Sequence, residues 1–277
     1  MKQEGTTTAT GQMQRLSDQA LQARLVQASN IARAAGELAL NYFNKGATLD
    51  IQTKGAQDWV TQADLEVERF IRRQLQSHYP EDTILGEEYG LNSLEDDQLM
   101  WLVDPIDGTT FFLKGIPQWA VVIGLAIGSE TLLAVVFEPV SGELFAAIRG
   151  QGATLNGHPI QVDPTADLSS GLVAVSSSVK LGGATSARMI ERLVNDGVMY
   201  CRLGSCALCL AYVASGRLLG MYEPLVHPWD SWAGELLVQE AGGRTLERSQ
   251  GADLGRPGPA IAAAPNVWDI MGELRGI

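Results

Sequence analysis

The chain has 277 residues, 45% of them hydrophobic, and a formal net charge of −12 at pH 7. This length and apolar content suffice for a core in one large domain or two small ones and exclude a disordered chain. The acidic balance argues against nucleic acid as a partner, because phosphate backbones are bound by clustered lysine and arginine. An anionic substrate is compatible with this charge if divalent cations reverse its local sign.

No segment predicts a membrane span or a secretion signal. The longest apolar stretch, residues 120–127 and 132–137, is interrupted by Gly128-Ser-Glu-Thr131 and falls short of the roughly 20 residues that a membrane helix needs. The first dozen residues are polar and lack the apolar core of a signal peptide. We therefore expect a cytoplasmic protein without membrane contact, in which residues 1–13 form a flexible tail.

The apolar periodicity and the turn residues predict alternating helices and strands along the whole chain. In order, we expect a helix over 14–44, a strand and loop over 50–60, a helix over 61–80, strands at 83–85 and 99–103, a meander at 119–127, 132–138 and 143–148, a strand at 172–176, a helix at 185–196, a strand at 199–203, a helix at 205–215, a strand at 218–223, a helix at 230–241, strands at 244–246 and 260–264, and a last helix. Mixed sheets layered with helices are the packing that this order favours. We divide the chain into an N-terminal α+β part, 14–165, and a C-terminal α/β part, 166–277, which together form one compact unit.

Two aspartates stand three residues apart in the segment Trp101-Leu-Val-Asp-Pro-Ile-Asp-Gly-Thr-Thr110, within and after an apolar run. We expect Asp104 and Asp107 where a buried strand ends, because the proline between them donates no backbone hydrogen bond and the following glycine permits conformations closed to other residues. Either threonine can then cap a helix whose N–H groups attract an anion. The segment combines carboxylates for a cation with N–H groups for a phosphate, although Asp-Pro and Asp-Gly are also ordinary turn dipeptides.

Further acidic residues stand at predicted strand ends or helix starts. Asp64 lies in the first turn of the second helix, and the pair Glu87-Glu88 follows a short strand, where a solvated loop is the alternative explanation. Asp230 precedes an apolar helical run, where a plain N-cap role is the alternative. Together with Asp104 and Asp107, these groups form an oxygen-rich set that suits a hard cation such as Mg²⁺.

Glu223 ends a predicted strand, and Gly204-Ser205 opens a predicted helix whose backbone N–H groups can hold a substrate oxygen or simply be capped by the serine. Cys206 and Cys209 form a C-x-x-C pair, but the nearest histidine, His227, stands alone and no second cysteine pair completes a zinc site. We therefore expect the two thiols to be buried on an apolar helix.

Taken in order, these motifs resemble the inositol monophosphatase superfamily of Mg²⁺-dependent, lithium-sensitive phosphatases. The match runs from Lys54 to Gly243 and comprises Asp58-Trp-Val-Thr-Gln-Ala-Asp64, Gly86-Glu-Glu88, Trp101 to Thr110, Gly204-Ser205, Trp229-Asp230 and Glu240-Ala-Gly-Gly243. The resemblance implies an α+β fold, a layered αβαβα sandwich with mixed β-sheets. It also implies a homodimer with two or three Mg²⁺ ions in each active site.

The same resemblance implies the metal ligands. Glu87, Asp104 and the backbone carbonyl of Ile106 would hold one ion. Asp104, Asp107 and Asp230 would hold the second, so that Asp104 bridges the two. A third and weaker ion would lie near Glu87.

The roles of the remaining matched residues follow from the resemblance as well. Asp64 and Thr109 would orient the metal-activated water as catalytic residues, with Glu88 supporting them from behind. Lys54 matches a lysine on a loop that approaches the site when metal binds. Almost no activity is expected when a chelator removes the metal.

The substrate contacts implied by the resemblance lie on three segments. The N–H groups of Gly108 and Thr109 would bind the phosphate, while Gly204-Ser205 and Glu223 would contact the hydroxyl-bearing part. One residue departs from the family pattern, because Phe111 stands where many members carry asparagine. The ring either packs into the core or changes the substrate pocket.

We rank a polyol or inositol monophosphate first among small phosphomonoester substrates, because a carboxylate at Glu223 suits hydroxyl groups. Histidinol phosphate comes second, since its ammonium group suits the same carboxylate. Fructose 1,6-bisphosphate and adenosine 3′,5′-bisphosphate come third, because no obvious basic cluster is present for a second phosphate. A catalytically silent relative with a binding or regulatory role is the hypothesis from a different class.

Overall fold

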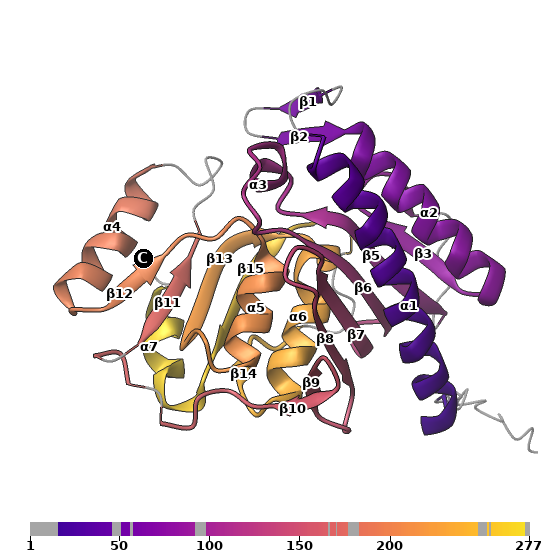
Figure 1. The fold of residues 1–277 in the computed structure, drawn as a ribbon. Coiled ribbons are helices and arrows are strands. Elements are labelled where there is room, and N and C mark those ends of the chain that lie inside the picture. The colour runs from indigo at the N-terminus through magenta and orange to yellow at the C-terminus, as the bar shows by residue number, and fades with distance from the viewer. Residues whose placement is uncertain are drawn as a thin grey trace, which may run out of the picture.

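The structure is a computed structural model that describes residues 16–45, 51–55, 58–91, 98–165, 167–169, 171–176, 183–248, 254 and 256–274, with side chains described outside 51–60. The expected tail, residues 1–13, lies outside this range. The elements form five layers, in which helices and sheets alternate (Figure 1). This architecture confirms the predicted α+β fold with its αβαβα layering.

The first layer consists of two helices, α1 (Asp18–Phe43) and α2 (Gln62–His78), joined through the hairpin of β1 (Ile51–Gly55) and β2 (Asp58–Thr61). The side chain of Ser17 caps α1 by accepting a hydrogen bond from Ala20 N at 3.2 Å. Small side chains dominate the buried face of α1, so the helix can approach the sheet closely.

The second layer is an eight-stranded sheet in the order β10-β9-β8-β7-β6-β5-β3-β4. Its strands are β3 (Thr83–Gly86), β4 (Gly90–Leu91), β5 (Leu99–Asp107), β6 (Ala120–Ile127), β7 (Glu130–Glu138), β8 (Glu143–Ile148), β9 (Ala153–Leu155) and β10 (His158–Ile160). Only the pair β3 and β5 is parallel among these strands of the described chain. Along β6, Val121 and Ile123 pack toward α1 and α2, whereas Val122 packs toward the other face.

The inner helices α5 (Cys206–Ala214) and α6 (Pro228–Glu240) lie between the two large sheets (Figure 1). The second sheet has the order β12-β11-β13-β15-β14, and α4 (Gly183–Asn195) and α7 (Trp268–Glu273) cover its outer face. Its strands are β11 (Leu172–Val175), β12 (Met199–Cys201), β13 (Gly220–Val226), β14 (Arg244–Thr245) and β15 (Gly258–Ala263). One core joins the inner helices to both sheets, which explains why α5 and α6 are apolar on almost every side.

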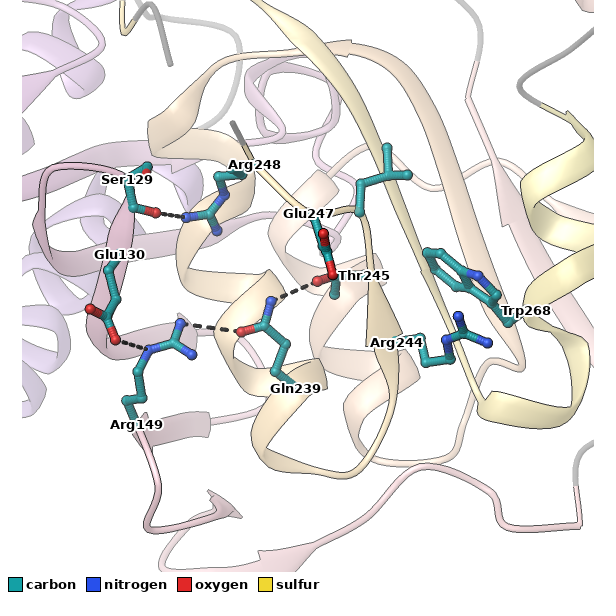
Figure 2. A pocket seen from close by; sticks show the side chains of 10 residues that line it. Ser129, Glu130, Arg149, Gln239, Arg244, Thr245, Glu247, Arg248 and Trp268 are labelled. Carbon is teal, nitrogen blue, oxygen red and sulfur yellow. Dashed lines mark hydrogen bonds and ion pairs between the residues drawn. The ribbon is translucent and has the colours of Figure 1, made fainter. Parts of the chain in front are cut away.

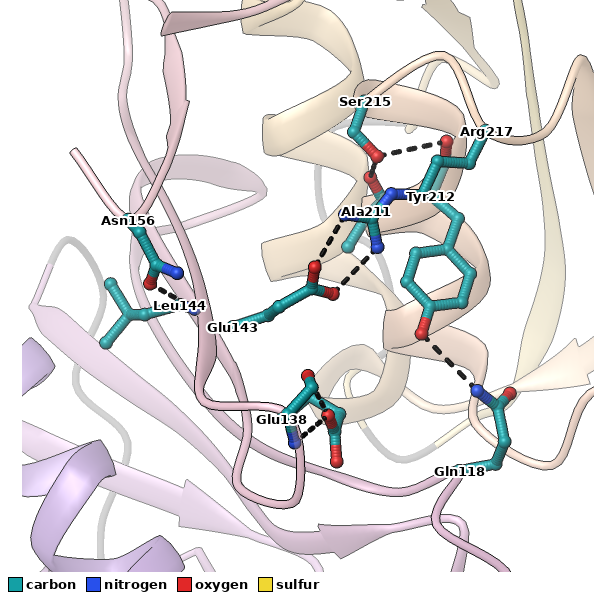
Figure 3. Close-up of polar contacts among 10 residues, drawn as sticks. Gln118, Glu138, Glu143, Leu144, Asn156, Ala211, Tyr212, Ser215 and Arg217 are labelled. Carbon is teal, nitrogen blue, oxygen red and sulfur yellow. Dashed lines mark hydrogen bonds and ion pairs between the residues drawn. The ribbon is translucent and has the colours of Figure 1, made fainter. Parts of the chain in front are cut away.

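Polar contacts connect the first sheet to α5 (Figure 3). Arg217, just after α5, donates two hydrogen bonds to the Glu143 carboxylate of β8, at 2.6 and 2.7 Å. Gln118, just before β6, donates to the Tyr212 hydroxyl at 3.3 Å. These contacts fix α5, whose first residues reach the candidate site, relative to the strands that precede it.

The structure departs from the predicted elements in two places that matter. The hairpin of β9 and β10 was not expected, because its strands are short and contain a proline. Strand β5 continues to Asp107 instead of ending at Val103. No helix in the described part of the chain is long and apolar enough to cross a membrane.

Candidate metal centre and active site

Strand β5 carries both aspartates of the central motif. Asp104 pairs with Val122 of β6 and Asp107 pairs with Ala120, so three steps along β5 match only two along β6. This irregularity accommodates Pro105, which has no N–H to give to the ladder. Asp104 and Asp107 are 2% and 7% exposed, and the Asp104 carboxylate accepts a hydrogen bond from Ile106 N at 2.9 Å.

Gly108 turns the chain from β5 into the short helix α3 (Thr109–Leu113). Its φ is +102°, and a Cβ atom there would lie 2.8 Å from the carbonyl oxygen of Gln118, so only glycine fits. Gly108 is itself the N-cap residue, without a side-chain cap. The expectation that Thr109 or Thr110 caps this helix is therefore wrong; the Thr109 hydroxyl instead donates to the Ile106 carbonyl at 3.2 Å.

The N-terminus of α5 points at Asp107. The Ser205 hydroxyl and the Ala207 N–H donate to Asp107 Oδ2 at 2.5 and 2.7 Å, and the Cys206 N–H donates to Oδ1 at 3.3 Å. Burial raises the pKa of Asp107 to about 6, and these hydrogen bonds oppose the increase. Ser205 also caps α5, as the sequence allowed, by accepting from Leu208 N at 3.0 Å.

Asp230 lies in the first turn of α6. Its carboxylate accepts a hydrogen bond from His227 N at 2.8 Å, and His227 is the N-cap residue. Asp230 is thus not the N-cap that the alternative explanation required. Burial raises its pKa well above the ordinary value, and the charge of Asp107 adds to the increase.

Four carboxyl groups act on one another at this place. Burial raises the pKa of Asp104 well above its usual range, and the charges of Glu87, Asp107 and Asp230 raise it further. We call these four residues the carboxylate cluster. They come from β5, from the segment after β3 and from α6, three parts of the chain that only the fold brings together.

The donor chemistry of the cluster fits a hard divalent cation, because the buried carboxylates of Asp104 and Asp230, beside further acidic groups, require positive charge in order to ionise. Within the described residues, no three His, Cys, Asp or Glu side chains are yet arranged as a ready coordination sphere.

Asp64 has a buried carboxylate oxygen without a partner. The residue is fully buried at the start of α2, where Asp64 Oδ2 accepts from the Thr61 N–H at 2.8 Å and from the Thr61 hydroxyl at 2.5 Å. Asp64 Oδ1 has no hydrogen-bond partner among the described residues. Burial raises the pKa of Asp64 to about 6, hydrogen bonds from Thr61 lower it, and the Glu88 charge raises it. A buried acceptor of this kind is costly unless a ligand or water uses it.

Glu68 holds the segment that carries Glu87 and Glu88, a role that the sequence did not suggest. Its buried carboxylate accepts from Glu88 N at 2.7 Å and from Arg72 Nε at 2.7 Å. A Cβ atom on Gly86 would lie 2.1 Å from Glu68 Oε1, so the Glu68 carboxylate can occupy this place only because residue 86 has no side chain. In the sequence, Glu68 and Arg72 are four residues apart on a predicted helix, which is also the spacing of an ordinary surface ion pair. Gly86 was the sequence feature that could have indicated that a side chain approaches the backbone closely at this point.

Glu223 of β13 lies close enough to Asp107 for the two carboxyl groups to interact. Burial raises its pKa to about 7 and the Asp107 charge adds to this, whereas hydrogen bonds from Ser176 and Cys206 oppose it. The fold therefore brings Glu223 and Gly204-Ser205 to the carboxylate cluster. The side chain of Lys54, on β1, lies outside the described residues.

The sequence matches a known protein family. The model of the inositol monophosphatase family matches residues 20–273. The chain belongs to this family.

Relatives within the inositol monophosphatase family carry two kinds of name. The chain is 38% identical to the Nus factor SuhB of Escherichia coli K12 over 242 residues, which cover 87% of this chain and 91% of that protein. A crystal structure of SuhB from Bartonella henselae superposes with a TM-score of 0.85 at 32% identity, covering 91% of this chain and 98% of the other. The inositol monophosphatase of an Anabaena (Nostoc) species gives 0.76 at 30% identity, covering 92% and 95%.

A cavity of about 580 Å³ lies elsewhere on this family member (Figure 2). It is lined by Ser129, Glu130, Arg149, Gln239, Arg244, Thr245, Leu246, Glu247, Arg248 and Trp268, none of which belongs to the carboxylate cluster. Arg248 pairs with Glu235 at 2.5 Å, and Arg149 pairs with Glu130 at 3.4 Å. Both guanidinium groups are thus already paired with carboxylates of the chain itself. We therefore assign no ligand to this cavity.

The two cysteines of the C-x-x-C pair are free and buried, as expected. Cys206 and Cys209 are 5% and 4% exposed on α5, within the apolar core. Burial raises the pKa of both thiols well above the ordinary value. A buried thiol of this kind is an inert core residue.

Proposed function

We propose that this chain is a Mg²⁺-dependent phosphomonoesterase that hydrolyses a small polyol phosphate, most readily inositol monophosphate. The observation that carries the proposal is the carboxylate cluster around Asp104, with the unpartnered oxygen of Asp64 buried in the same fold. The cluster provides carboxylates that can bind cations, and Asp64 provides a hydrogen-bond acceptor for a water molecule.

The metal assignments are part of the proposal. Glu87, Asp104 and the carbonyl of Ile106 would hold one Mg²⁺, and Asp104, Asp107 and Asp230 a second, with a third near Glu87. When bound, Mg²⁺ would lower the pKa of a water molecule and neutralise the negative charge that develops on the oxygen of the leaving alcohol.

The residues of the chain orient the reactants. Asp64 Oδ1 accepts a hydrogen bond from the attacking water, and Thr109 helps to align that water, with its hydroxyl held by the Ile106 carbonyl. The N–H groups of Gly108 and Thr109 face the phosphate, and Glu88 supports Asp64 electrostatically. The water oxygen forms the new bond to phosphorus as the bond to the alcohol oxygen breaks. One proton of the water ends on the leaving alcohol, and the other stays with the released phosphate.

We assign Glu223 to binding the alcohol part of the phosphomonoester substrate. A half-buried carboxyl whose pKa lies near 7 can accept from a hydroxyl or bind an ammonium group. The first case fits a polyol, and the second fits histidinol phosphate, the alternative substrate.

The test is phosphate release at fixed Mg²⁺ from myo-inositol 1-phosphate, histidinol phosphate, fructose 1,6-bisphosphate and adenosine 3′,5′-bisphosphate, with Asp104→Asn as the blank. We expect the highest kcat/KM for myo-inositol 1-phosphate and none in the blank. A dominant kcat/KM for histidinol phosphate would select the alternative. Equal turnover by the blank would overturn the metal mechanism.

A second candidate function is binding without catalysis, which the name Nus factor of the SuhB relatives favours. Every proposed ligand and water-orienting residue is present in this chain, which favours an enzyme. A pure binder would gain thermal stability from Mg²⁺ yet release no phosphate from any ester. Measuring both quantities on one preparation separates the two candidates.

We also propose a homodimer, formed through α4 and the edge strand β12. Four apolar residues there are exposed, namely Ile190, Val194, Met199 and Tyr200, at 37%, 59%, 69% and 38%. Exposed apolar groups on an edge strand are typical of an interface. Light scattering after size exclusion should give twice the chain mass for the natural protein and one chain mass for Met199→Lys. Val140→Lys, at an exposed position in the turn after β7, is the matched control.

A further inference from the structure

Phe111 of α3 lies directly on Gly204, in the turn before α5. A Cβ atom on Gly204 would fall 2.0 Å from Cδ2 and 2.4 Å from Cγ of the Phe111 ring, far inside van der Waals contact. Gly204 is not one of the described residues with positive φ, so the ring and not the backbone conformation requires a glycine. The two residues therefore form a fitted contact between α3 and α5.

Core packing does not account for Phe111, because its neighbour Phe112 performs that role. Phe112 is 2% exposed, and its ring lies edge-on to Trp119 with centroids 4.9 Å apart. Phe111 is half-buried and belongs to none of the hydrophobic clusters of the described residues. Phe111 is therefore not enclosed by the core, and part of the residue remains exposed.

The contact stands beside the carboxylate cluster. Ser205, next to Gly204, donates to Asp107 at 2.5 Å, and Thr109, two residues before Phe111, donates to Ile106 at 3.2 Å. The Phe111 ring thus connects the two segments that flank Asp107. The Phe111 ring contacts Gly204, and Glu223 contacts Cys206 two residues further along the same turn.

We propose that Phe111 is a specificity-determining residue, whose ring selects phosphomonoesters of a cyclic alcohol over those of an open-chain alcohol. This inference rests on the proposed phosphatase function. An aromatic face gains free energy from C–H groups laid against it. A cyclic alcohol holds several C–H groups on one side of its ring, whereas an open-chain alcohol must lose conformational entropy to present them together. Glu223 then receives the hydroxyl or ammonium group at another edge of the same alcohol.

The experiment compares kcat/KM at fixed Mg²⁺ for myo-inositol 1-phosphate and for glycerol 2-phosphate in the natural protein, in Phe111→Asn and in Phe111→Tyr. We expect the ratio between the two esters to fall about tenfold in the asparagine variant, the upper range for an aromatic contact. The tyrosine variant, which keeps the ring, should hold the ratio within about twofold. Equal losses for both esters, or an unchanged ratio in Phe111→Asn, would overturn the inference.

A stability measurement tests the contact without any turnover. Gly204→Ala should lower Tm clearly in the natural chain and much less in a Phe111→Ala background, since the three atoms nearest to the added methyl group all belong to the Phe111 ring. Equal effects in both backgrounds would show that the ring does not lie on Gly204. If the natural protein hydrolysed no ester at all, the proposed function would fail, while this cycle would still report on the contact.

Discussion

The carboxylate of Glu68 accepts a hydrogen bond from the backbone N–H of Glu88 at 2.7 Å, and Glu68 is fully buried. A helix that contributes no residue to the carboxylate cluster thereby fixes the segment carrying Glu87. The Arg72 guanidinium balances the buried charge at 2.7 Å. Glu68 is a positioning residue for the candidate site.

Glu68→Gln should therefore lower the free energy of unfolding by about 3 kcal/mol, because the buried charge of Arg72 is no longer balanced by a carboxylate. Urea denaturation measures this change. Activity should fall with a lower kcat, since Glu87 is no longer held in place. Glu191→Gln, on the exposed side of α4, is the control and should change neither quantity. Natural stability in Glu68→Gln would contradict the positioning role.

Asp104→Asn should reduce kcat at least about 10³-fold, because a group that bridges two cations contributes several kcal/mol. In chelator the same variant should be more heat-stable than the natural protein. The reason is that one buried charge surrounded by three acids is removed. Calorimetry with and without Mg²⁺ checks the second point, and a less stable variant in chelator would count against it.

Asp64→Asn should separate catalysis from metal binding. The substitution removes the charge that orients water, so we expect kcat to fall about 10²- to 10⁴-fold. The increase in Tm on adding Mg²⁺ should stay close to that of the natural protein, because Asp64 is not assigned as a ligand. Loss of the Mg²⁺-dependent increase would place Asp64 among the ligands instead.

The stability of the metal-free protein should fall as pH rises. The pKa values of Asp64 and Asp107 are raised to about 6 and that of Glu223 to about 7, whereas unfolded carboxyls titrate near pH 4. Folding thus favours the protonated forms. Their contribution is complete below about pH 4 and is lost as pH passes 6 to 7.

Thermal unfolding in chelator between pH 5 and 8 measures this slope. Excess Mg²⁺ should flatten it by stabilising the ionised carboxylates. Asp107→Asn, which has one fewer titrating group, should give a shallower slope in chelator than the natural protein. A Tm in chelator that does not change with pH would contradict the prediction.

Thiol reactivity should distinguish Cys201 from the pair on α5. Cys201 is half-buried, whereas Cys206 and Cys209 are buried and their thiol pKa values are raised well above normal. We expect a thiol reagent at pH 8 to modify Cys201 first and the other two only after unfolding. Rapid modification of Cys206 in the native protein would revive a redox role for the C-x-x-C pair.

The sequence by itself determined the order of most helices and strands and the acidic, oxygen-rich character of the candidate site, whereas the αβαβα layering was expected from the family resemblance. The helical spacing of apolar residues in 18–43 specifies which face of that helix is buried, and the unbroken apolar run in 120–127 predicts a strand buried on both faces, since these patterns are local properties of the chain. The motif from Trp101 to Thr110 likewise predicted carboxylates beside a turn, because proline and glycine act within their own segment. The membership of Asp64, Glu87 and Asp230 in one site followed from family resemblance and not from spacing.

Only the tertiary structure decided what depends on contacts between distant segments. The bulge that extends β5 to Asp107 exists because β6 pairs with it, and Gly108 caps α3 because Gln118 leaves no room for a side chain. The Glu68 carboxylate and the Phe111 ring each fill the space above a glycine from another part of the chain. Local sequence cannot encode such pairs, because the shape of each partner is set by packing across the whole fold.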